Sequence, residues 1–177
     1  MNPVLRMTWA TLAAAAIFSA AAFAQTTIGP DAGAKARGEV TSSATFQRHA
    51  QDYSRMMYNS QQIQPAAAPA VVEKQAATVK ENLTKSDEGL KAVKAAHAKD
   101  AEVVKLVDSI LKHHANAASH CDMVAECCKK GDGPGKIADC CVDIHDELEA
   151  AKKDMDKLTK HLKIEELPIP KKQATKK

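Results

Sequence analysis

The feature that most constrains this chain is a repeated spacing of mostly apolar residues. In three stretches, these residues are separated by four and three positions in strict alternation. Such spacing places every member of a series on one face of an α-helix, as in the seam of an antiparallel bundle. The three series are Val72, Ala76, Val79, Leu83, Ser86, Leu90, Val93 and His97; Val103, Val107, Ile110, His114, Ala117, Cys121, Val124 and Cys128; and Ile137, Cys141, Ile144, Leu148, Ala151, Met155, Leu158 and Leu162. The sequence therefore predicts three long, packed helices.

The residues between these stretches are typical of helix ends. Asp100 is placed to cap the N-terminus of the helix that follows it. Gly131 and Gly133 are expected to end that helix, and Pro134 suits the first turn of the next one. Because short turns make sequential helices antiparallel, we expect an all-α, antiparallel up-and-down helical bundle. The heptad seams also permit a homodimer.

The part of the chain before these helices is predicted to be less regular. Residues 25–44 are rich in Gly, Ala, Thr and Ser and show no apolar period, so we expect them to be disordered. A shorter N-terminal helix is predicted over residues 45–62, followed by a proline-containing connector at residues 64–69. Its apolar seam would be Phe46, Ala50, Tyr53 and Met57. The bundle domain is thus expected to span residues 45–163.

The two ends of the chain are predicted to lie outside this domain. Residues 1–24 read as a secretory signal peptide, with Arg6 before an apolar run and Ala22-Phe23-Ala24 before the expected cleavage point. The apolar run is too short for a comfortable membrane span. We therefore expect an exported protein, periplasmic or secreted, without a stable membrane anchor. Residues 164–177 are predicted to form a basic, disordered tail.

The charge balance and the low aromatic content limit the kinds of partner and of core that we expect. The chain has 25 Lys and Arg against 22 Asp and Glu, and both signs are mixed along the helices. This balance argues against nucleic acid as a partner. After removal of the signal, the aromatic residues are Phe46, Tyr53 and Tyr58. A core with so few aromatic rings buries little area per residue, and thin cores often need disulfides or a metal as an additional fastening.

Cysteine and histidine residues concentrate on the last two predicted helices. On the third helix, adjacent pairs recur every seven residues and so stay on one face. On the fourth helix, two cysteines lie in the first turns and a histidine lies one turn deeper. Antiparallel packing would bring the two sets together. The residues are His113, His114, His120, Cys121, Cys127 and Cys128 on the third helix, and Cys140, Cys141 and His145 on the fourth.

Thiolate and imidazole ligands favour soft or borderline metals, so we expect copper(I) or zinc to bind this cluster. The first four-ligand set would be Cys121, Cys128, Cys141 and His145, with Cys127 and Cys140 as alternates and His120 beside them. Met56, Met57 and Met123 could add thioethers. His113 and His114 lie about 20 Å along the helix from Cys127 and Cys128, so they would need an ion of their own. Asp87 on the second helix is placed to face them.

Disulfide bonds are the alternative use of the same cysteines. Export to an oxidising compartment lets disulfides persist, and Cys127 or Cys128 could pair with Cys140 or Cys141. Each such bond would close a loop of about a dozen residues and contribute about 3 kcal/mol. The odd number of cysteines would leave a free thiol. The protein would then be a disulfide-stapled periplasmic bundle with an interaction or stress-related role and no metal.

Enzymatic activity has little support in the sequence. The chain has no Glu-x-x-His pair, no His-Glu-x-x-His, no Cys-x-x-Cys and no Cys-x-x-Cys-His. These patterns mark di-iron bundles, zinc proteases, thioredoxin-like redox proteins and covalent haem attachment, respectively. We therefore expect a binding protein rather than an enzyme.

The expected architecture resembles that of the bacterial copper-storage bundles, whose cores are lined with cysteines. Those proteins are richer in cysteine and repeat a Cys-x-x-x-Cys pattern. The cysteines of this chain are instead spaced by six, one, twelve and one residues. The resemblance is therefore one of architecture, and no residue roles are transferred from that family.

Overall fold

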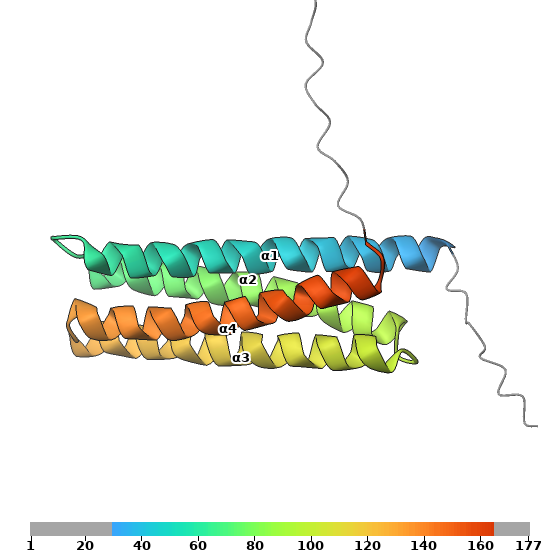
Figure 1. Cartoon of the computed structure of the whole chain (residues 1–177). Helices are drawn as coiled ribbons and strands as arrows, with labels where there is room; N and C mark the ends of the chain where they lie inside the picture. Colours follow the sequence, from blue (N-terminus) through green and yellow to red (C-terminus); the bar gives the residue numbers. More distant parts are fainter. Residues whose placement is uncertain (1–29, 165–177) are drawn as a thin grey trace, which may run out of the picture.

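The computed structural model describes residues 30–164, which form an antiparallel bundle of four α-helices. The helices are α1 (Pro30–Gln62), α2 (Pro69–Ala96), α3 (Ala101–Lys130) and α4 (Pro134–His161). Each packs against two others: α1 against α2 and α4, and α3 against α2 and α4. Figure 1 shows the α1–α2 and α3–α4 connections at one end of the bundle and the α2–α3 connection at the other. The predicted fold class is thus confirmed.

The N-terminal helix is not the short one that we predicted. α1 has 33 residues, against 28, 30 and 28 in the other three helices. Residues 30–44, expected to be disordered, form its first half. The predicted signal peptide, residues 25–29 and the tail beyond Ile164 lie outside the described residues.

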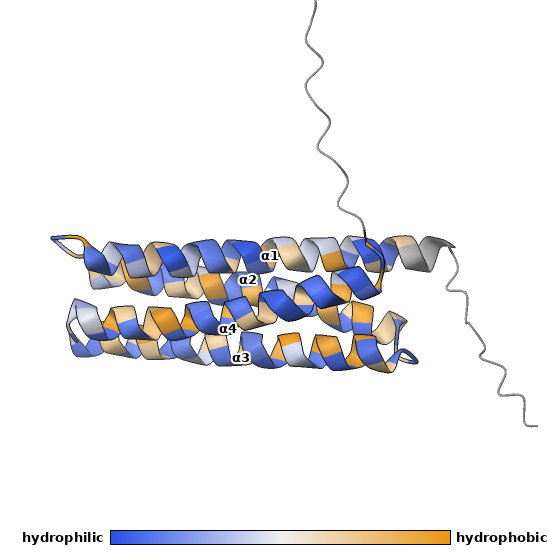
Figure 2. Ribbon diagram, in the orientation of Figure 1, coloured by the Kyte–Doolittle hydropathy of each residue, from blue (hydrophilic) through white to orange (hydrophobic). Residues whose placement is uncertain are grey.

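The reason for this error is that the seam of α1 is mostly small and polar. The inward positions keep the alternation of four and three, but half of them are Ser or Gln. They are Ala36, Val40, Ser43, Gln47, Ala50, Ser54, Met57 and Gln61, all buried. Ala50 and Met57 were placed correctly by the sequence, whereas Phe46 and Tyr53 are only half-buried. Figure 2 shows α1 as largely hydrophilic towards the α1–α2 connection and paler towards its N-terminal end.

The predicted helix ends are close to those in the structure. The Asp100 carboxylate accepts hydrogen bonds from the backbone N–H groups of Glu102 and Val103, as an N-cap does. Gly131 ends α3 in the left-handed conformation, with φ of 71°, which glycine adopts without steric cost. Gly133 is the N-cap of α4, immediately before Pro134, rather than part of the end of α3. None of the helices described between residues 30 and 164 is long and apolar enough to cross a membrane.

The interior contains two hydrophobic clusters, one towards each end of the bundle. The cluster at the α3–α4 turn includes residues from Val72 to Leu83 of α2 and from Ala117 to Cys128 of α3. The cluster at the other end includes Leu90 and Val93 of α2 and Val103 to Ile110 of α3. This division places the four buried cysteines in the cluster at the α3–α4 turn.

Buried polar residues occupy the level between the two clusters. Ser43 of α1 and Ser86 of α2 each donate a hydroxyl hydrogen bond to the backbone carbonyl of the other, at 2.9 and 3.0 Å. Next to them, a Cβ atom on Gly89 would overlap the Ser43 hydroxyl, so the two helices approach closely here. Gln47 and Gln51 donate to the Leu148 carbonyl of α4 at 3.3 and 3.2 Å. These bonds satisfy polar groups that would otherwise be costly to bury.

Candidate functional site

All five cysteines gather at the α3–α4 end of the bundle, and all are free thiols. Cys121, Cys127, Cys128 and Cys141 belong to the same buried cluster, and Cys140 packs against it. The two sets come from facing helices joined by the tight turn at Gly131. Antiparallel packing therefore brings the cysteines of α3 and α4 together, as the seven-residue spacing on α3 and the start of α4 predicted.

The deepest thiols are those of Cys121 and Cys141. Their side chains are 1% and 0% exposed. Burial raises the pKa of each thiol to about 12. The neighbouring thiol of Cys141 adds to this shift for Cys121, and the thiols of Cys140 and Cys128 add to it for Cys141. Both are therefore protonated and unreactive at neutral pH in the metal-free protein.

A second thiol pair lies nearer the turn. The thiol of Cys127 neighbours that of Cys140, which is only half-buried. Burial raises the pKa of Cys127, and the nearby carboxylate of Asp132 raises it further. That carboxylate is itself paired with Lys136 at 2.8 Å, and this contact lowers its pKa. Burial likewise raises the pKa of Cys128, which lies between the two pairs.

Two of the predicted histidine ligands, His113 and His114, are engaged elsewhere. His113 Nδ1 lies 2.7 Å from a carboxylate oxygen of Glu147 on α4. His114 Nδ1 lies 2.6 Å from Asp87 on α2, which confirms that Asp87 faces this level of α3. His114 is fully buried between the two hydrophobic clusters, one helical repeat away from Cys121. The structure thus separates this histidine pair from the thiols.

The other two histidines, His120 and His145, retain unused hydrogen-bonding capacity. In each ring, Nδ1 is buried and has no hydrogen-bond partner among the described residues. The nearest carboxylate oxygen to His120 Nδ1, on Asp143, is 3.8 Å away and too distant for a hydrogen bond. Buried polar atoms are normally satisfied, so these two ring nitrogens are candidates for contact with a ligand.

A groove on the bundle surface leads to part of this cluster. It lies between α1 and α4 and has a volume of about 320 Å³. α4 contributes Cys141, Val142 and His145. α1 contributes Ser54, Arg55, Tyr58 and Asn59, none of which we predicted as part of the site. The signal that was missed is the four-and-three spacing of α1, which continues through Ser54. Had Ser54 been recognised as an inward position, this part of α1 could have been predicted to line the site.

The predicted four-ligand zinc set is not assembled in this arrangement. Among the residues that the structure describes, no three His, Cys, Asp or Glu side chains lie close enough to hold one metal ion. Cys121, Cys128, Cys141 and His145 share one end of the bundle without converging on a common point. What the facing helices supply is neighbouring thiols: Cys141 lies near Cys121, Cys128 and Cys140, and Cys140 lies near Cys127.

The predicted thioether donors divide between core and surface. Met57 is buried in the same cluster as the cysteines. Met56 and Met123 are exposed large apolar side chains, so they do not join the buried thiols. The reason is their position on the helix, because Met56 and Met123 each lie one residue before a seam position. The side chains at those seam positions, Met57 and Val124, point into the core.

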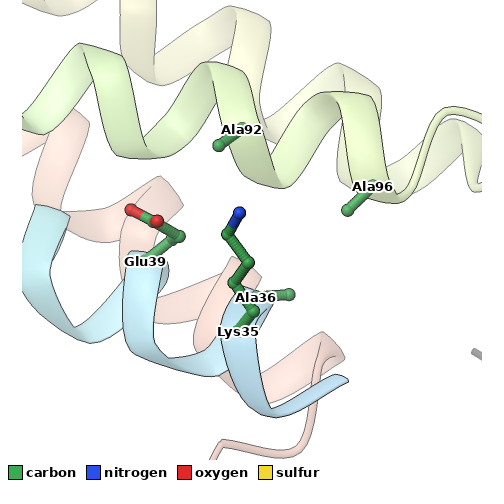
Figure 3. A pocket seen from close by; sticks show the side chains of 5 residues that line it. All are labelled: Lys35, Ala36, Glu39, Ala92 and Ala96. Carbon is green, nitrogen blue, oxygen red and sulfur yellow. The ribbon is translucent and has the colours of Figure 1, made fainter. Parts of the chain in front are cut away.

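A smaller hollow at the opposite end of the bundle has different chemistry. Its volume is about 140 Å³, and Figure 3 shows Lys35, Ala36 and Glu39 of α1 facing Ala92 and Ala96 of α2. It contains no cysteine or histidine. The thiol end is therefore the part of the described molecule with distinctive ligand chemistry.

Comparisons of the chain with protein-family models, with curated proteins and with solved structures give no match.

Proposed function

We propose that this protein is an exported copper(I)-binding bundle that sequesters or carries the ion between pairs of cysteine thiolates. The observation that supports this most strongly is the gathering of five free thiols from two facing helices at one end of the bundle. These five cysteines are all of the cysteines in the chain, and they lie at one end of the bundle. Thiolate sulfur is the ligand that copper(I) selects over hard cations.

The pairwise arrangement favours copper(I) over zinc. Zinc sites take three or four protein ligands in tetrahedral geometry, and such a group is not assembled among the described residues. Copper(I) is satisfied by two or three soft donors. The Cys121–Cys141 and Cys127–Cys140 pairs each offer two thiols from adjacent helices, and Cys128 lies between them.

Binding on these thiols must release protons. A metal binds the thiolate form, and burial holds the thiols of Cys121 and Cys141 protonated well above neutral pH. The apparent affinity should therefore rise as the pH rises. It also follows that Cys121 and Cys141 of the metal-free protein resist adventitious oxidation, because the thiolate is the reactive form.

The test is a titration of the reduced mature protein with copper(I) held by a coloured chelator, at several pH values. We expect transfer of whole equivalents of copper, tighter at pH 8 than at pH 6. Replacement of Cys121 and Cys141 together by Ser should remove at least one equivalent. Ala117→Ser is the matched control, because it adds the same hydroxyl at a buried position of α3 without removing sulfur.

Unchanged copper uptake in the double variant would sink the proposal. The alternative function, a disulfide-stapled bundle without metal, has the Cys127–Cys140 pair as its best support, because those two thiols are neighbours nearest the turn. It predicts that protein from an oxidising compartment has lost these thiols and takes up no copper. Export itself is a prediction from the N-terminal residues.

A further inference from the structure

The groove between α1 and α4 combines features that an access route to the buried thiols needs. Cys121 and Cys141 are sealed in the core, yet Cys141 also lines the groove. His145 lies one helical turn further along α4 on the same wall, and its Nδ1 is buried without a partner among the described residues. Cys141, one of the two deepest thiols, thus lies at a surface opening, with the imidazole of His145 on the same wall.

We propose that copper(I) enters the bundle through this groove, delivered by a small anionic thiol ligand, and binds first at Cys141 and His145. This inference rests on the proposed function and adds a route and a carrier class to it. The volume of about 320 Å³ is far larger than a bare ion requires, and it accommodates an ion together with a small carrier. Arg55 on the α1 wall brings positive charge, which complements a negatively charged carrier.

The transfer is a ligand exchange at constant oxidation state. The bond from copper to a carrier thiolate breaks, and a bond from copper to Cys141 Sγ forms. The proton of the Cys141 thiol leaves with the departing carrier, which becomes a free thiol. Copper remains copper(I), so the step requires neither an oxidant nor a reductant. The bond from copper to the His145 ring nitrogen is then exchanged for a bond to Sγ of Cys121, the neighbour of Cys141, and the Cys121 thiol proton passes to the freed imidazole nitrogen.

The first test blocks the groove. Val142 lines it and is 42% exposed, so Val142→Trp places an indole ring in the opening. Val71→Trp is the matched control, because Val71 is a similarly exposed valine, at 49%, outside the groove. The measurement is stopped-flow uptake of copper(I) from an anionic thiol complex. We expect Val142→Trp to slow uptake about tenfold with the final copper content unchanged, and Val71→Trp to match the wild type.

The second test addresses the charge of the carrier. Arg55→Gln should slow uptake from the anionic complex and leave uptake from copper(I) in dilute acetonitrile, a neutral ligand, unchanged. Arg48→Gln is its control, since Arg48 is an exposed arginine of the same helix that does not line the groove. Circular dichroism of each variant verifies that the bundle is folded.

The outcomes separate this inference from the proposed function. If both tryptophan variants load at the wild-type rate and to the same content, the groove is not the route, although copper binding stands. If Arg55→Gln affects neither carrier or both equally, the anionic carrier is wrong. If the wild type takes up no copper from either source, the route and the proposed function are both overturned.

Discussion

At the scale of single residues, the most informative side chain outside the thiol cluster is His114. It is fully buried at the polar level between the two hydrophobic clusters, with Asp87 at 2.6 Å from its Nδ1. Its Nε2 has no partner among the described residues. Among the described residues, Asp87 is thus the hydrogen-bond partner on which the buried ring depends. The sequence placed Asp87 opposite His114 but did not show that the ring has no second partner.

Removal of Asp87 should expose that dependence. Asp87→Ala leaves the buried imidazole without a partner and should lower the free energy of unfolding by about 1–3 kcal/mol. The double variant Asp87→Ala with His114→Leu removes both polar groups and should recover most of the loss, because replacing both partners by apolar groups is nearly neutral. Urea denaturation measures both values. Unchanged stability of Asp87→Ala would show that the contact contributes nothing, and equal losses in the two variants would show that the unpartnered imidazole is not the cause.

The buried thiols predict a loss of stability in alkali. The folded protein raises the pKa of Cys121 and Cys141 from an ordinary value of 9.0 to about 12, so it holds these protons more tightly than the unfolded chain. This contribution is fully present below pH 9 and is lost as the pH rises towards 12. Each thiol lowers stability by about 1.4 kcal/mol per pH unit in that window.

Thermal unfolding of the metal-free protein between pH 8 and pH 11 measures this effect. The variant with Cys121 and Cys141 both replaced by Ala is the comparison, because it lacks the two titrating groups. We expect its melting temperature to decline less steeply than that of the wild type over this range. Parallel declines would mean that other groups account for the alkaline sensitivity.

At the scale of helices, the contact between α1 and α2 depends on small residues. A Cβ atom on Gly89 would overlap the Ser43 hydroxyl and approach the Glu39 carbonyl oxygen at 3.2 Å. A Cβ atom on Gly38 of α1 would instead meet no other atom within 4 Å. The two glycines thus offer opposite environments for the same added methyl group.

Substitution by alanine should therefore have opposite effects at these two sites. Gly89→Ala forces α1 and α2 apart and should destabilise the protein by about 1–3 kcal/mol. Gly38→Ala removes a flexible residue from a helix interior and should stabilise it by about 0.5–1 kcal/mol. Chemical denaturation of the two variants provides the measurement. Stabilisation by Gly89→Ala would show that the close approach is not required.

The predictability of each helix follows from the residues in its seam. α2, α3 and α4 were visible in the sequence because Val, Leu and Ile occupy most inward positions. α1 was underestimated because Ser43, Gln47 and Ser54 occupy inward positions and make hydrogen bonds that no apolar pattern reports. For the same reason, the α1 residues that line the groove were not predicted as part of the site. Helix registers predicted the gathering of the cysteines, but not the failure of four ligands to converge, which depends on side-chain directions.

At the scale of the whole molecule, the two ends of the bundle differ in composition. The end that carries the α2–α3 connection has a hydrophobic cluster of aliphatic residues and Met155. The opposite end mixes aliphatic residues with four of the five cysteines and opens to the surface at the groove. The polar level at Ser43, Ser86 and His114 lies between them. Ligand binding at the thiol end should therefore stabilise the fold by linkage.

Copper(I) should accordingly raise the melting temperature of the wild type. At a free copper concentration one hundred times the dissociation constant, linkage predicts a gain of about 2.7 kcal/mol for one site. The variant with Cys121 and Cys141 replaced by Ser should gain less, whereas Ala117→Ser should gain as much as the wild type. Calorimetry with and without copper measures the difference, and equal gains in all three proteins would place the binding elsewhere.

The central claim, that the gathered cysteines hold copper as thiolates, is tested most directly by the native mass of the intact mature protein. The protein should be made in an oxidising periplasm with both copper and zinc supplied. Our account predicts a mass raised by whole copper ions, with all five thiols still reduced once the metal is removed. A mass without metal, lowered only by the hydrogens lost in disulfide formation, would contradict it and make the cysteine cluster a structural staple.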